Sequence, residues 1–97
     1  MIRSFRNKET ESLFRLMPDR KFAAIERIAL RKLVQPDLAA SFSDLRSPPG
    51  NRLEALKGDR VGAWRIRVND QYRICFRWTE DGPEDVEIVA YHWRTRP

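Results

Sequence analysis

Three runs of residues between positions 64 and 90 alternate between apolar and polar side chains. The apolar members are Trp64, Ile66 and Val68, then Tyr72, Ile74, Phe76 and Trp78, then Val86, Ile88 and Ala90. A period of two places successive side chains on opposite faces of a strand, so each run predicts a half-buried strand. We expect a fourth strand over residues 52–57, just before the first run.

The connections between these runs are short. Asn69 and Asp70 suit a tight hairpin turn, and the segment from Gly58 to Gly62 suits a slightly looser one. Strands that are joined this closely must run antiparallel. The second half of the chain therefore predicts an antiparallel sheet with one apolar face, which the first half must cover.

The first half has helical spacing instead. Its apolar positions are Leu13, Phe14 and Met17, then Phe22, Ile25, Ile28, Ala29 and Leu33, then Leu38, Phe42 and Leu45. Pro18 and Asp19 separate the first two groups, and Asp19 is a helix-start residue. We expect Pro36 to end the second helix and begin a shorter helical stretch. The fold class predicted is α+β, with two N-terminal helices on a twisted antiparallel sheet of four to five strands.

The charges of the chain are unevenly placed. The net charge is +5, and fifteen of the nineteen basic residues are arginine, whose planar fork suits phosphate. Arg65, Arg67, Arg73 and Arg77 fall on the face opposite the apolar one, where four like charges repel unless an anion or an acidic partner covers them. We expect Arg77 to form an ordinary surface ion pair, because residues 79–87 hold five acids and predict a solvated loop. The pattern indicates a nucleic acid or an acidic protein as partner.

Length and composition exclude several classes of protein. Ninety-seven residues predict a single domain, 1–97, too small for a large cofactor. The lone cysteine, Cys75, rules out an intrachain disulfide and is expected to be inert packing. No apolar run reaches the ~20 residues of a membrane span, and no secretory signal is recognised, which favours a cytoplasmic location. His92, the only histidine, follows Tyr91 and is the one candidate for imidazole chemistry.

Three segments carry a family resemblance. They are residues 48–60, which include Leu-Lys-Gly-Asp-Arg, residues 64–78, with their Arg-Ile-Arg-Val and Tyr-Arg-Ile strands, and residues 85–92, which end in Tyr-His. Together with the opening Met-Ile-Arg-Ser-Phe, they closely resemble the HigB toxins of the RelE/ParE superfamily. The resemblance spans residues 1–92 and implies the RelE-like fold, in agreement with the α+β prediction; residues 93–97 are a short C-terminal extension.

The resemblance also implies an activity. It is that of a toxin of a type II toxin–antitoxin system, a metal-free endoribonuclease without a cofactor that cleaves messenger RNA in the ribosomal A site. The ribose 2′-hydroxyl attacks the adjacent phosphate, which requires a base, a cation and an acid. By resemblance, the catalytic residues are Arg73 on the phosphate, Lys57 assisting it, Tyr91 and His92 as acid and base, and Glu54 where some relatives have a histidine. The residues expected to bind RNA are Arg52, Arg60, Arg65 and Arg67.

Partners follow from the same resemblance. They are a helix-turn-helix antitoxin of the HigA type and the ribosome with its messenger RNA. Operator DNA is expected to be contacted only through the antitoxin, and no membrane is expected as a partner. Two departures matter: Ala90 stands where many relatives have an acid, and residues 93–97 continue past the histidine, where relatives commonly end. Two alternatives stay open. The first is a toxin-fold binding module without catalysis, in which Ala90 reflects a lost active site, and the second is a ParE-like inhibitor of DNA gyrase, since that branch shares the fold.

Overall fold

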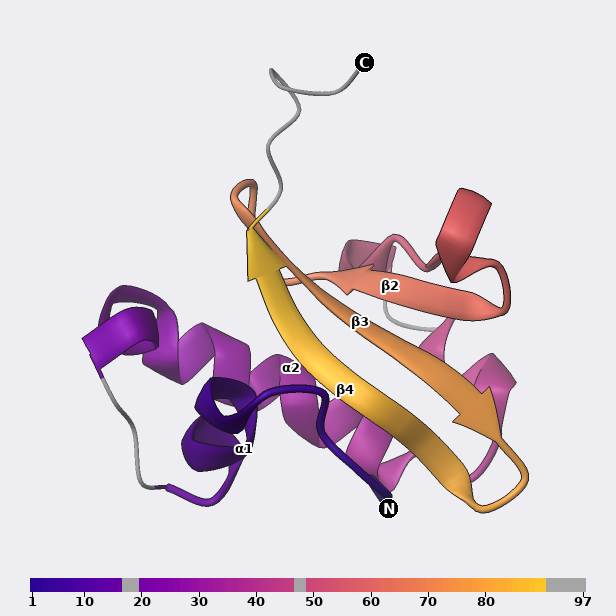
Figure 1. Cartoon of the computed structure of the whole chain (residues 1–97), viewed down its shortest axis with the longest axis horizontal. Coiled ribbons are helices and arrows are strands. Elements are labelled where there is room, and N and C mark those ends of the chain that lie inside the picture. The colour runs from indigo at the N-terminus through magenta and orange to yellow at the C-terminus, as the bar shows by residue number, and fades with distance from the viewer. Residues whose placement is uncertain (17–19, 47–48, 91–97) are drawn as a thin grey trace.

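The computed structural model describes residues 1–16, 20–46 and 49–90 of the chain (Figure 1). Its elements are the helices α1 (Lys8–Phe14) and α2 (Glu26–Leu38), the strands β1 (Glu54–Ala55), β2 (Ala63–Arg67), β3 (Tyr72–Thr79) and β4 (Gly82–Ala90), and 3-10 turns at Arg20–Ile25, Phe42–Leu45, Pro49–Asn51 and Gly58–Arg60. The strands form one antiparallel sheet in the order β1-β2-β3-β4. Figure 1 shows α2 crossing behind the strands and α1 beside β4. This architecture confirms the predicted α+β fold.

The turn between β2 and β3 is the tight hairpin that the sequence predicts. The side-chain oxygen of Asn69 accepts hydrogen bonds from the amides of Gln71 at 2.8 Å and Tyr72 at 2.9 Å. An asparagine that bonds the backbone two or three residues ahead closes a turn without another element. The amide of Val68 also donates to the carbonyl of Tyr72 at 3.0 Å, which fixes the register at the start of β3.

The outer edge of β4 is covered by the N-terminal residues. The amide of Val86 donates to the carbonyl of Ser4 at 3.1 Å, and the amide of Arg6 donates to the carbonyl of Val86 at 2.9 Å. This pairing is a parallel bridge between Phe5 and Val86, a single bridge where the sequence left room for a fifth strand. Thr10 of α1 is fully buried, and its hydroxyl accepts from the amide of Ile88 at 2.9 Å. These contacts protect an edge that would otherwise offer free backbone groups.

The core lies between α2 and the apolar face of the sheet. It combines helix residues such as Leu33 with strand residues such as Ile66, Ile74 and Phe76, all fully buried. Tyr72, Trp64 and Trp78 pack around this core. The apolar face read from the period of two is therefore confirmed.

Two expectations about element ends are wrong. Pro36 lies inside α2, which continues to Leu38, because a proline in the last turn costs only the bond to the carbonyl four residues back while its ring is buried in the interior. The strand expected over residues 52–57 is confined to Glu54–Ala55, because Arg52 has a left-handed backbone with φ of +47° that interrupts the extended chain.

The acidic stretch from 79 to 87 is not a solvated loop. β4 begins at Gly82, so only Glu80 and Asp81 lie between β3 and β4. Glu87 is buried, and its carboxylate accepts a hydrogen bond from Arg60 at 2.8 Å. An acid whose carboxylate bonds a guanidinium from a nearby turn can occupy a sheet, and local charge density does not reveal this.

Candidate nucleic-acid interface

The sheet face opposite the helices carries the predicted arginines. Arg67 lies directly across from Arg73 on the β2–β3 ladder, and Arg65 lies across from Cys75. Residues that face each other on adjacent strands point to the same side of a sheet. The prediction that these arginines share one face is confirmed.

Carboxylates accompany two of these arginines. Arg65 pairs with Glu54, its partner on β1, at 3.3 Å, and Arg67 pairs with Asp70 at 2.5 Å. The expectation that the arginines need an outside anion to relieve their repulsion is therefore wrong for these two. Glu54 and Asp70 are exposed, so solvent screens both pairs and each contributes little to stability. An incoming phosphate can displace such carboxylates at little cost.

Arg73 is held by main-chain carbonyls of its own hairpin. One guanidinium nitrogen donates to the carbonyl of Tyr72 at 3.0 Å and to the carbonyl of Asn69. These bonds hold the half-buried side chain beside the turn that joins β2 and β3. A guanidinium that is held in place before the reaction is a suitable stabiliser of a developing phosphorane charge.

The positive field extends from Arg73 toward α2. The pKa of Asp70 is lowered by its hydrogen bond and charge interaction with Arg67, and also by the charges of Arg73 and Arg52. Burial lowers the pKa of Lys32, and repulsion from Arg67 and Arg31 lowers it further. Both shifts have the sign that a dense group of cations produces. The basic end of the interface is thus formed by Arg52, Arg67 and Arg73, and the charge of Arg67 also acts on Lys32 of α2.

Lys32 of α2 is anchored by a buried asparagine. The ammonium of Lys32 donates to the side-chain oxygen of Asn51 at 2.8 Å. The amide of Asn51 donates in turn to the side chain of Gln35 at 2.7 Å and to the carbonyl of Leu45 at 3.1 Å. Neither Lys32 nor Asn51 was predicted from the sequence, because a lysine on a helix and an asparagine in a loop are ordinarily solvated.

The remaining predicted residues are dispersed along the face. Lys57 is exposed just before the 3-10 turn Gly58–Arg60. Arg60, at the end of that turn, forms an ion pair with Glu87. Tyr91, His92 and the extension 93–97 lie outside the described residues. The last described residue, Ala90, lies across from Tyr72, so β4 ends beside the hairpin that holds Arg73.

Cys75 lies in the middle of this face without contributing chemistry to it. The residue is buried, and burial raises the pKa of its thiol. A thiol that is kept protonated is a poor nucleophile and a poor metal ligand. Among residues 1–16, 20–46 and 49–90, no group of three or more potential ligands is placed to hold a metal ion.

Comparison with known protein families shows which family the chain belongs to. A model described as "RelE-like toxin of type II toxin-antitoxin system HigB" matches residues 3–92. The chain belongs to this HigB-like toxin family. It is also 46% identical to Toxin HigB-1 of Vibrio cholerae over 72 residues, which are 74% of this chain and 72% of that protein.

Two further similarities are found, one in sequence and one in structure. An uncharacterized protein of Haemophilus influenzae is 38% identical over 52 residues, 54% of this chain and 52% of that protein. A solved structure of a YoeB/ParE toxin from Agrobacterium tumefaciens superposes with a TM-score of 0.50 at 18% identity, covering 94% of this chain and 99% of that one. At that identity the superposition establishes the fold alone.

Family membership makes this HigB-like chain the toxin of a type II toxin–antitoxin system, and therefore one with an antitoxin partner. The described part of the chain contains no helix that is both long and apolar enough to cross a membrane.

Proposed function

We propose that this HigB-like toxin is a ribosome-dependent endoribonuclease that cleaves messenger RNA in the ribosomal A site without a metal. The observation that carries the proposal is the group of cations on the exposed sheet face, where Arg73 is held by carbonyls of its own hairpin and lies directly across from Arg67. Such a surface offers several donors to successive phosphates of a single strand.

A few side chains carry out the steps of this reaction. Arg73 stabilises the pentacovalent phosphate, and Lys57 assists it or positions the RNA. His92 and Tyr91 supply the base that takes the 2′ proton and the acid that protonates the leaving 5′ oxygen. Glu54 is a secondary base, because its carboxylate is already paired with Arg65 at 3.3 Å.

The partners we propose follow the same logic. A helix-turn-helix antitoxin of the HigA type binds the toxin in the cytoplasm and blocks the arginine face with acidic side chains, and the complex contacts operator DNA through the antitoxin. The free toxin then places its face against the message in the decoding site. Acidic groups and phosphates compete for the same guanidinium donors.

Induction in growing cells tests the proposal. The wild-type toxin should arrest growth and produce 5′-hydroxyl ends within translated messages, and Arg73→Ala or His92→Ala should relieve the arrest. Arg27→Ala, which changes an exposed arginine of α2, is the matched control and should stay toxic. Intact messages with altered DNA supercoiling would instead identify a gyrase inhibitor.

A second candidate function rests on Ala90. This residue ends β4 where many relatives carry an acid, and it lies across from Tyr72 near the proposed reaction site. If that acid is needed to orient the histidine, the chain is a binding module that acts with the antitoxin. Ala90→Asp would then create message cleavage in a toxin whose wild-type form binds ribosomes without cutting.

A further inference from the structure

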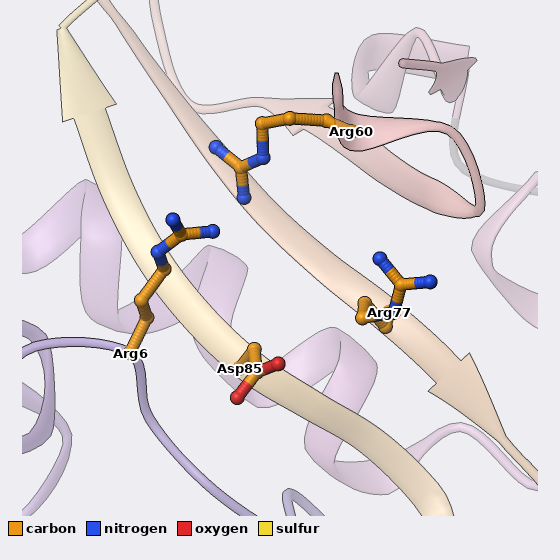
Figure 2. Close-up of a pocket in the computed structure, with 4 residues that line it drawn as sticks. All are labelled: Arg6, Arg60, Arg77 and Asp85. Atoms are coloured by element: carbon orange, nitrogen blue, oxygen red, sulfur yellow. The ribbon is translucent and has the colours of Figure 1, made fainter. Parts of the chain in front are cut away.

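Three arginines and one aspartate converge on a pocket of about 300 Å³ (Figure 2). Arg6 comes from the N-terminal segment, Arg60 from the turn before β2, Arg77 from β3 and Asp85 from β4. Figure 2 shows the guanidinium groups of Arg6 and Arg60 approaching each other over the two long strands, with Asp85 between Arg6 and Arg77. No residue of this set except Arg60 was predicted to contact a ligand.

Asp85 owes its place to a bulge in β4. Cys75 lies across from Glu87, but Arg77 lies across from Glu84, so β4 holds one residue more than β3 over this interval. Asp85 takes the left-handed backbone, with φ of +53°, that such a bulge requires. A bulge redirects the side chain at its corner and often occurs beside a functional site.

The arginines of the pocket carry more positive charge than the one buried carboxylate beside them balances. Arg60 bonds one oxygen of the buried Glu87 carboxylate at 2.8 Å, and Arg6 lies 3.8 Å from the other oxygen. Two guanidinium groups therefore share one carboxylate. Arg77 forms no ion pair with any residue in the described ranges, so the surface ion pair expected for it is absent there.

We infer that this pocket is a second phosphate-binding site, which holds the backbone of RNA whose reacting phosphate lies at Arg73. Arg77 and Arg73 lie on the same face of β3, four residues apart, which corresponds to ~13 Å along a strand. A short stretch of extended RNA bridges that distance. The inference rests on the proposed function, since it takes the RNA at Arg73 as given.

The composition of the pocket favours a nucleotide over an acidic peptide segment. The guanidinium groups donate to phosphate oxygens, while the Asp85 carboxylate can only accept, as from a ribose 2′-hydroxyl. A carboxylate side chain of an acidic peptide brings acceptors only, whereas a nucleotide brings a phosphate and, on the adjoining ribose, a hydroxyl donor. RNA satisfies both kinds of group.

Binding of a labelled single-stranded RNA to the full-length toxin without ribosomes tests the inference. Arg77→Ala should weaken the Kd several-fold and lower the slope of log Kd against log salt by about 0.7, the value for one phosphate contact on a single strand. Arg46→Ala, at an exposed arginine of the helical half, is the matched control and should change neither. Arg6→Ala, which leaves Arg60 on Glu87, is a second variant and should act like Arg77→Ala.

Asp85→Gly tests the contact with the ribose separately from the overall charge of the pocket. Glycine keeps the left-handed backbone of the bulge, so the pocket retains its shape while losing the acceptor. This variant should narrow the preference for RNA over DNA of the same sequence. An unchanged preference would refute the contact with the 2′-hydroxyl.

The outcomes separate this inference from the proposed function. If Arg77→Ala and Arg6→Ala bind RNA like the wild type, the inference fails, even if the wild type cleaves messages on ribosomes. If both variants lose affinity for an acidic antitoxin segment and keep it for RNA, the pocket is a protein-docking site and the inference is again overturned. If both variants lose RNA binding and the wild type cleaves no message on ribosomes, the pocket is supported and the proposed function is refuted.

Discussion

Replacing Asn51 with alanine should strongly destabilise the toxin. The Asn51 side chain is fully buried and makes three hydrogen bonds, to Lys32, to Gln35 and to the carbonyl of Leu45. After truncation, Lys32 and Gln35 can turn to water because both are partly exposed, but the Leu45 carbonyl faces the interior. An unsatisfied buried acceptor costs about 1–3 kcal/mol, and the loss of the other two bonds adds to this.

The expected decrease in the free energy of unfolding is therefore about 3 kcal/mol, which lowers the Tm of a domain of this size by roughly 12–24 °C. Equilibrium unfolding in urea, followed by circular dichroism, measures this directly. Gln71→Ala, at an exposed hairpin position, is the control and should stay within about 0.5 kcal/mol of the wild type. A change below about 0.5 kcal/mol for Asn51→Ala would refute the network.

Three further predictions concern stability. Glu87→Ala should cost about 2 kcal/mol in urea unfolding, because it leaves the partly buried Arg60 guanidinium without its carboxylate, and an unchanged midpoint would contradict the pairing. Burial raises the pKa of the Cys75 thiol, so the protonated thiol favours the folded state. This contribution to the free energy of unfolding is complete below the unfolded pKa of about 8.5 and is lost as the pH rises through the folded pKa. Above that pH the wild type should therefore lose more unfolding free energy than Cys75→Ala. If the unfolding free energies of the two proteins depend on pH in the same way, this prediction is wrong. Gly82→Ala should cost about 1–3 kcal/mol and speed amide exchange at Arg3, since the new Cβ would lie 2.3 Å from the Met1 carbonyl oxygen at a φ of +123°; normal protection at Arg3 would disprove the clash.

The sheet and its two faces were predictable because they depend on local information. A period of two assigns every residue of β2 and β3 to a face, and the Asn69 turn fixes which residues lie opposite each other. The shared face of Arg65, Arg67 and Arg73 follows directly. The length of β1 was not predictable, because it depends on the backbone conformation of a single residue, Arg52.

The pairing of charges could not be read in the same way. Glu87 meets Arg60 and Arg6 only because the bulge shifts the register of β4 and because the N-terminal segment runs along its edge. These contacts join residues distant in sequence, and neither local charge nor periodicity encodes them. The same holds for the hydrogen bond between Lys32 of α2 and the buried Asn51.

The central claim is that the toxin cleaves ribosome-bound message with Arg73 on the reacting phosphate. Single-turnover cleavage on purified ribosomes, with 5′ ends mapped by primer extension, tests it most directly. The account predicts cuts in the A-site codon, no cuts without ribosomes, and a rate that Arg73→Ala lowers by about 10²-fold or more while ribosome binding persists. Equal rates for the wild type and folded Arg73→Ala, or equal cutting of free message, would contradict it.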